Sequence, residues 1–159
     1  MKKKIAEILE DASVVRVSVD TVNPSKCKAL LGISGRVLEI KKGNIRKLIK
    51  LKEERGGSVR IGISALVLRD TYLELEDVVR FGIETGVDFV EIKGEYTGRD
   101  KLSLDEMSDI QTVLALLKKR YCNNGSGATE LIVRDEMFAE SALLNSKVCW
   151  RTQHGRAHV

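Results

Sequence analysis

Residues 87–94 read VDFVEIKG, and this short stretch decides which kind of sheet the chain forms. Most of its residues are hydrophobic, as expected for a strand that is buried in a parallel sheet. Glu91 and Lys93, however, alternate with hydrophobic residues, and successive side chains of a strand point to opposite faces. One face of this strand therefore carries charge. A doubly wound sheet would cover that face with helices and bury an unpaired charge, which is energetically costly.

Two earlier stretches divide in the same way into an apolar face and a polar face. Residues 14–20 read VVRVSVD, and residues 58–66 read SVRIGISAL. Valine, isoleucine and alanine make up the apolar face of each stretch. The opposite faces carry Arg16, Ser18 and Asp20 in the first stretch, and Ser58, Arg60, Gly62 and Ser64 in the second.

Between these strands, apolar residues recur at the spacing of one helix face. Residues 36–54 predict one helix, which the following glycine pair ends. Thr71 and Glu74 have the spacing of a capping box, which predicts the start of a second helix. The buried face of this second helix is expected to consist of Leu75, Val78, Val79 and Ile83.

A third helix is predicted after Ser103, because Glu106 follows it at capping-box spacing. Residues 122–130 read CNNGSGATE and predict a loop, since glycine, asparagine and serine favour turns. Residues 130–133 read ELIV and predict a fourth strand. The alternation of strands and helices indicates a parallel sheet with right-handed crossovers.

We expect these elements to form an α/β fold, a partial TIM-type barrel with parallel strands and outer helices. A barrel covers only the outside of its sheet with helices, and such folds bind ligands at the carboxyl ends of their strands. Glu91 and Lys93 would then face the interior of the barrel. The alternative is a sheet whose polar face is merely solvated, which is more common for antiparallel sheets than for parallel ones.

The composition is that of one soluble globular domain, because the chain has 159 residues of which 43% are hydrophobic and 31% charged. A run of about 18 apolar residues, as a membrane-spanning helix needs, does not occur. The polar amino-terminal sequence is also unlike a secretory signal. We therefore expect a cytoplasmic protein with no membrane partner.

The net charge of +4 invites a nucleic-acid-binding interpretation. The residues involved would be the cations of the helix at 36–54, namely Lys41, Lys42, Arg46, Lys47 and Lys50. This interpretation is not favoured, because glutamates accompany these cations and aromatic residues make up only 4% of the chain. A solvated helix face explains the same pattern.

The strand motifs resemble those of radical S-adenosylmethionine (SAM) enzymes. RVSVD at 16–20, VRIGIS at 59–64 and GVDFVEIKG at 86–94 are similar, in order and spacing, to the fourth, fifth and sixth strands of that family's six-stranded barrel. The resemblance covers about residues 12–120. It implies a fold that is roughly the second half of a (β/α)6 barrel.

The resemblance also implies roles for residues on the polar faces. Ser18 occupies the place of a serine that contacts the carboxylate end of SAM, and the main chain near Lys93 corresponds to a segment beside the adenine. The implied cofactor-binding residues are Ser18, Asp20, Ser64 and Lys93, and the implied substrate-binding residues are Arg16, Arg60 and Glu91. The basic side chains could equally form ion pairs with Asp20 or Glu91 across the interior, because buried charges need partners.

The chain departs from the family in lacking the CxxxCxxC motif, whose thiolates hold the four-iron four-sulfur cluster that binds SAM. The resemblance therefore implies a fragment that supplies part of the SAM and substrate pocket for 5′-deoxyadenosyl radical chemistry and is inactive alone. Its partners would be a small-molecule or peptide substrate, together with a complementing amino-terminal half or a second copy. The alternative is a half-barrel that binds an anionic or phosphorylated small molecule through Arg16, Arg60 and Lys93, without iron–sulfur chemistry.

The end of the sequence resembles the start of an auxiliary-cluster region of the SPASM or twitch type. Residues 1–121 would form the barrel half, residues 122–147 a loop and the last barrel element, and residues 148–159 the start of that region. Cys149 would then be a metal ligand. A zinc site of Cys149, His154 and His158 would have only three ligands, and a free buried cysteine is the other alternative.

Overall fold

The computed structural model describes residues 9, 12–94, 102–122 and 129–134. Within these residues, one parallel sheet has its strands in the order β1 (Val14–Ser18), β2 (Arg60–Val67), β3 (Phe89–Gly94) and β4 (Glu130–Arg134). Each strand pairs with the one that follows it in the sequence. The predicted parallel strands are confirmed, including the fourth one, which the sequence placed at 130–133.

Helices connect these strands. They are α2 (Pro24–Leu31), α3 (Gly35–Arg55), α4 (Leu75–Thr85) and α5 (Leu104–Leu117), with a 3-10 turn η1 (Tyr72–Glu74) before α4 and a π-helical turn η2 (Lys118–Cys122) after α5. As predicted, α3 ends at a glycine, Gly56, in the left-handed conformation. The capping box of Ser103 and Glu106 is also confirmed, because each side chain accepts a hydrogen bond from the other residue's backbone N–H.

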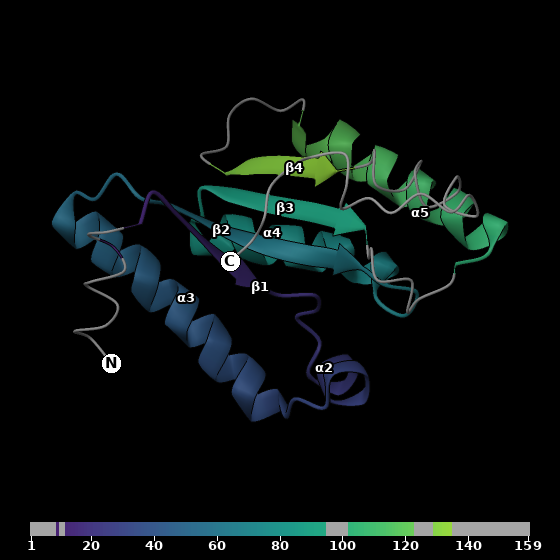
Figure 1. The fold of residues 1–159 in the computed structure, drawn as a ribbon, viewed down its shortest axis with the longest axis horizontal. Helices are drawn as coiled ribbons and strands as arrows, with labels where there is room; N and C mark the ends of the chain where they lie inside the picture. The colour runs from purple at the N-terminus through teal and green to yellow at the C-terminus, as the bar shows by residue number, and fades with distance from the viewer. Residues whose placement is uncertain (1–8, 10–11, 95–101, 123–128, 135–159) are drawn as a thin grey trace, which may run out of the picture.

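The helices that connect the strands lie on one side of the sheet. Crossovers between parallel strands are right-handed, and the strand order never reverses, so each crossover passes over the same face. Figure 1 shows α4 behind β2 and β3, with α3 on the side of β1. The core fills the space between this face and the helices, and its fully buried residues include Ile61, Ile63, Ile92, Ile45, Val78 and Ile110. This arrangement matches part of a parallel barrel, with β1 and β4 at the edges of the described sheet.

The predicted capping box at Thr71 and Glu74 is wrong. The side chain of Thr71 makes no capping hydrogen bond, and the chain passes through the 3-10 turn η1 before α4 begins. The hydroxyl of Thr71 is buried and has no hydrogen-bond partner among the described residues. Glu74 turns away from the helix start and instead contacts residues that follow β1, as described below.

The predicted burial of Ile83 is also wrong, since this residue is 43% exposed while Phe81 and Gly82 are buried. Gly82 explains the difference. A Cβ atom at this position would lie 2.4 Å from a side-chain carbon of Val90, so only glycine lets α4 approach β3 this closely. The close approach centres the buried face of α4 on Gly82 and leaves Ile83 at its rim.

Among the described helices, none combines the length and the apolar character needed to cross a membrane. The predicted segment 148–159 lies outside the described residues, as does most of the predicted segment 122–147 apart from β4. Their assignment to a loop, a last barrel element and an auxiliary-cluster region stays a prediction.

Candidate functional site

The face of the sheet opposite the helices carries polar side chains from all four strands, and we call it the polar face. Residues that are in register on parallel strands project to the same side. One row of the polar face consists of Arg16, Gly62, Phe89 and Glu130, and the next consists of Ser18, Ser64, Glu91 and Ile132. A third row holds Leu66, Lys93 and Arg134. The structure thus brings the predicted polar residues of three strands onto one surface.

The polar face is not simply solvated, because Ser64 is only 7% exposed and Glu91 only 5%. Such values are typical of a protein interior, and they are unexpected for an open sheet surface. This observation argues against the solvated-sheet alternative.

An aromatic ring fills the amino-terminal part of the polar face. Phe89 is buried and lies over Gly62, where a Cβ atom would come within 2.3 Å of the ring. The guanidinium carbons of Arg16 and Arg60 lie 5.8 Å and 5.2 Å from the ring centre, within the range of cation–π attraction. The absent side chain at Gly62 therefore makes room for Phe89, and Phe89 helps to place both arginines.

Glu91 lies between two arginines that come from different strands. Its carboxylate oxygens are 3.4 Å from Nε of Arg16 on β1 and 3.1 Å from Nε of Arg134 on β4. A buried carboxylate without partners would be strongly destabilising, and these two guanidinium groups compensate its charge. The structure thus explains why a strand that is mostly hydrophobic contains this glutamate.

A second ion pair crosses the sheet in the same region. Arg60 on β2 contacts Glu130 on β4 at 2.6 Å, passing over β3. The pair of Arg16 and Glu91 likewise passes over β2. Strands that are two positions apart in a sheet are separated by about 9.6 Å, so these side chains converge over the strand between them. Arg16 and Glu91, two of the residues predicted to bind substrate, therefore contact each other, and the third, Arg60, contacts Glu130.

Nearer the carboxyl ends of the strands, the polar side-chain groups of three predicted cofactor-binding residues form no ion pair or hydrogen bond with other described residues. Ser18 and Ser64 are paired in register on neighbouring strands. Neither hydroxyl has a hydrogen-bond partner among the described residues, and the same holds for the ammonium group of Lys93. These groups can therefore donate hydrogen bonds to a ligand without breaking a contact that the described structure contains.

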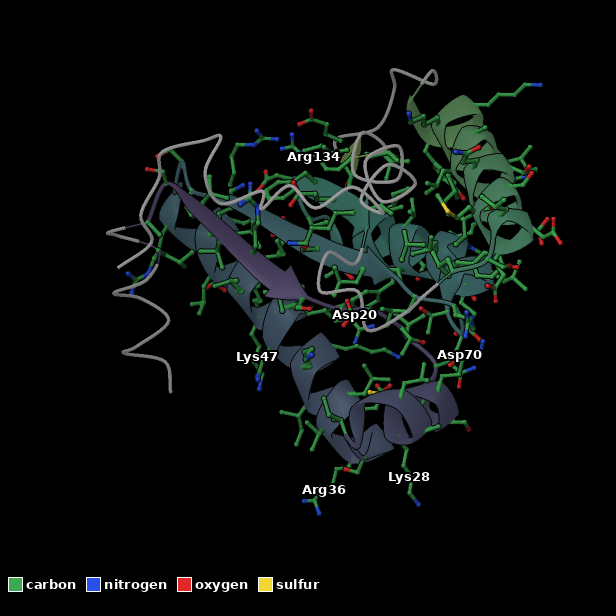
Figure 2. The ribbon with its side chains drawn as sticks, turned by 45° about the vertical axis from the view of Figure 1, so that its right-hand side comes forward. Asp20, Lys28, Arg36, Lys47, Asp70 and Arg134 are labelled. Carbon is green, nitrogen blue, oxygen red and sulfur yellow. The ribbon has the colours of Figure 1, made fainter. Side chains whose placement is uncertain are left out.

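Asp20 differs from the other predicted cofactor-binding residues. Its Oδ1 atom accepts a hydrogen bond of 2.9 Å from the backbone N–H of Leu66, so its carboxylate ties the chain after β1 to β2. Figure 2 shows Asp20 just beyond the tip of β1, and Arg134 lies at the opposite edge of the sheet, on β4. The described contact of Asp20 is structural, and its contact with SAM stays a prediction.

Sequence reasoning missed a cluster centred on Glu74. The carboxylate of Glu74 accepts hydrogen bonds of 3.1 Å from both Thr21 and Asn23, and it lies 3.2 Å from Nζ of Lys26. These contacts join the loop after β1 to the loop after β2, and loops at this end of a parallel barrel border its ligand site. The capping-box pattern concealed the role of Glu74, since it offered a local partner for a residue whose partners are distant in sequence.

The metal-ligand predictions fall outside the described residues, where Cys149, His154 and His158 all lie. Within the described residues, no group of three or more histidine, cysteine or acidic side chains is arranged to hold a metal ion. Cys27 is a free, buried thiol. The assignment of Cys149 as a metal ligand therefore stays a prediction.

The basic side chains of α3 mostly make contacts within the fold. Lys41 donates to the carbonyl of Ser18, Lys42 pairs with Glu39, and Lys50 pairs with Glu54. Arg46 lies over the ring of Phe81 at 5.5 Å. Figure 2 shows Lys47 pointing away from the sheet. Because these cations are used locally, the structure gives the nucleic-acid interpretation no added support.

The fold is similar to that of three crystal structures of SuiB from Streptococcus suis. In the structure bound to S-adenosylmethionine, SuiB is 18% identical to this chain with a TM-score of 0.55, and the match covers 84% of this chain and 29% of SuiB. In the structure bound to the precursor peptide SuiA, the identity is 17%, the TM-score is 0.57, and the match covers 94% of this chain and 34% of SuiB. A further SuiB structure matches with a TM-score of 0.57.

No protein-family model matches the chain, and the comparison with curated proteins finds no match. At this level of identity, the SuiB structures establish a shared fold. The chain spans about a third of the length of the SuiB chains that it matches.

Proposed function

We propose that this chain forms the part of a radical SAM enzyme that holds SAM and faces the substrate. The observation that carries the proposal is that the polar side-chain groups of Ser18, Ser64 and Lys93, near the carboxyl ends of parallel strands, have no hydrogen-bond partner among the described residues. Such strand ends are where parallel barrels bind their ligands. The fold shared with SuiB, which binds SAM in one crystal structure, supports the same proposal.

In this proposal the residues of the polar face divide into two groups. Ser18 and Ser64 donate hydrogen bonds to the carboxylate end of SAM, while the main chain near Lys93 lies beside its adenine. Arg16, Glu91 and Phe89 form the base of the site, which we call the floor. Within the floor, Glu91 and Phe89 hold the guanidinium group of Arg16 in position. Asp20 holds the ends of β1 and β2 together, so that the serines stay in register.

SAM supplies hydrogen-abstracting chemistry when it is bound in an intact enzyme of this family. The chain's own contribution is to bind and orient it and to exclude water from the site. The described residues do not fit an iron–sulfur cluster, because they contain no suitable group of ligands and the sequence has no CxxxCxxC motif. We therefore propose that these 159 residues bind SAM without cleaving it.

We further propose that the substrate is a peptide. The support is the SuiB structure bound to the precursor peptide SuiA, which matches 94% of this chain. A peptide would lie over the polar face beside SAM, where buried and half-exposed polar groups from several strands can reach it.

The proposal is tested by titrating SAM into the purified chain and following backbone amide signals by NMR. Ser64→Ala should weaken SAM binding about tenfold, because a hydrogen bond to a charged group contributes on the order of 1.5 kcal/mol. Ser58→Ala is the matched control, since Ser58 is an exposed serine before the amino-terminal end of β2. The proposal is supported if SAM binding is saturable, Ser58→Ala binds SAM as tightly as the unsubstituted chain, and Ser64→Ala binds it more weakly.

The absence of saturable binding, or equal effects of the two serine substitutions, would contradict the proposal. A second measurement tests the lack of cleavage. After reconstitution with iron and sulfide and reduction, the chain alone should release no 5′-deoxyadenosine, and release of this product would show that the chain holds a functional cluster.

A further inference from the structure

The guanidinium group of Arg16 is held in a defined orientation on the polar face. Its Nε atom lies 3.4 Å from Glu91, and its central carbon lies 5.8 Å from the ring centre of Phe89. The side chain is nevertheless 55% exposed. Among the described residues, its two terminal Nη groups have no hydrogen-bond partner. Such a guanidinium is preorganised to bind an anion, because its two terminal N–H donor groups already have a defined orientation.

The charges of the polar face favour an anionic ligand. Among the described residues, four cations, Arg16, Arg60, Lys93 and Arg134, lie on it with two carboxylates, Glu91 and Glu130, and the third carboxylate beside it, Asp20, already accepts a hydrogen bond from the backbone of Leu66. The carboxylate that holds Arg16 is also the less accessible one, since the side chain of Glu91 is 7% exposed. A ligand above Arg16 therefore meets positive charge that is only partly compensated from below.

We infer that Arg16 binds a carboxylate of the substrate, so that the peptide carries an acidic side chain close to the residue that reacts. This inference rests on the proposed function, because it takes the polar face as the peptide site. Arg16 and Ser18 project from the same face of β1, two residues apart, which corresponds to about 6.6 Å along a strand. Ser18 holds SAM in the proposed function, and an extended peptide rises by about 3.3 Å per residue, so the acidic residue lies within about two positions of the peptide residue nearest to SAM.

The test compares two blocked peptides, Ac-Gly-Glu-Ala-Gly-NH2 and its glutamine counterpart, titrated into the full chain. The readout is the Nε–Hε NMR signal of Arg16, which reports on this side chain directly. The glutamate peptide should shift this signal in a saturable way, and the glutamine peptide should not. Arg16→Gln should weaken binding of the glutamate peptide about tenfold.

Two further variants make the result specific. Arg36→Gln is the matched control, because Arg36 is an exposed arginine on α3 that points away from the sheet in Figure 2. It should leave peptide binding unchanged. Arg16→Lys keeps the charge but loses the fork, so it should bind the glutamate peptide more weakly than the unsubstituted chain, and it serves as the test variant where Arg16→Gln does not fold.

Three outcomes would overturn the inference: equal binding of the two peptides, equal effects of substituting Arg16 and Arg36, or competition by inorganic phosphate at the same concentration as the glutamate peptide. The last outcome would indicate a site for small anions. The two proposals fail separately. Normal SAM binding without a preference for glutamate contradicts the inference alone, whereas Arg16-dependent glutamate binding without SAM binding contradicts the proposed function alone.

Discussion

The Nε atom of Arg16 on β1 lies 3.4 Å from a carboxylate oxygen of Glu91, two strands away on β3. This pair spans β2 between the row of Gly62 and the row of Ser64, beside the ring of Phe89 that lies over Gly62. It links the edge of the described sheet to its interior and fixes the orientation of a half-exposed guanidinium. The arrangement of the polar face can be tested through the residues that build it.

Replacing Glu91 should destabilise the fold. Glu91→Gln removes the negative charge between two arginines, and we expect the free energy of unfolding to fall by about 1–2 kcal/mol, because hydrogen bonds to charged groups contribute about this much. Urea denaturation of the purified variant measures the change. Glu130→Gln is the control, since both partners of the Arg60–Glu130 pair are about half exposed and such surface pairs contribute less than about 1 kcal/mol. A larger loss of stability in Glu130→Gln than in Glu91→Gln would contradict the conclusion that the buried Glu91 ion pairs stabilise the polar face.

Adding a methyl group at Gly62 should also be destabilising. A Cβ atom there would lie 2.3 Å from the ring of Phe89, which must move, and overpacking of this kind costs about 1–3 kcal/mol. The measurement is the thermal or urea unfolding of Gly62→Ala. Gly43→Ala is the matched control, because Gly43 lies inside α3 with no atom within 4 Å of the added carbon. Since alanine is a better helix former than glycine, this control should be neutral or more stable by about 1 kcal/mol. Stability losses of equal size in both variants would show that the Phe89 contact does not matter.

Asp88 should make part of the stability depend on pH. Burial raises the pKa of its carboxyl, but hydrogen bonds from the N–H of Ile61 and from Lys52 outweigh this effect, so the pKa lies below its ordinary value. A lowered pKa in the folded state means that the carboxylate stabilises the fold above its unfolded pKa of about 3.9 and loses this effect as the pH falls through the folded pKa. Asp88→Asn should therefore be less stable than the unsubstituted chain at pH 7, by about 1–2 kcal/mol.

The difference caused by Asp88→Asn should shrink as the pH is lowered below about 4, as measured by urea unfolding at a series of pH values. Asp109→Asn, at an exposed position of α5, serves as the control and should show a difference near zero throughout. A constant difference between the Asp88→Asn variant and the unsubstituted chain across this range would refute a charge-dependent role for Asp88.

Glu74 should hold the two loops beside the site together. Glu74→Ala removes the acceptor for Thr21 and Asn23, and because Thr21 is only 2% exposed its hydroxyl would be left without this partner. We expect a loss of about 1–3 kcal/mol and faster amide hydrogen exchange in the loop after β1. Glu84→Ala, at an exposed position of α4, is the control. Unchanged exchange in the Glu74 variant would show that the loops are held by other contacts.

Much of the fold followed from local patterns. The alternation in residues 58–66 predicted that Val59, Ile61 and Ile63 are buried, and they are, because successive side chains of a strand must point to opposite faces whatever the partner is. The long helical connections predicted parallel pairing for the same reason of chain geometry. Local patterns failed where a tertiary contact took precedence, as at Ile83, which the close approach of Gly82 to β3 moved to the rim.

The sequence by itself determined that three strands each have one apolar and one polar face, since this depends only on the period of two residues along a strand. The tertiary structure decided which polar groups pair and which stay available. Arg134 was not predicted to approach Glu91, nor Asp20 to accept from Leu66, because these contacts depend on strand order and register. An ion pair requires two side chains to meet within about 4 Å, and only the folded chain brings residues from different strands that close.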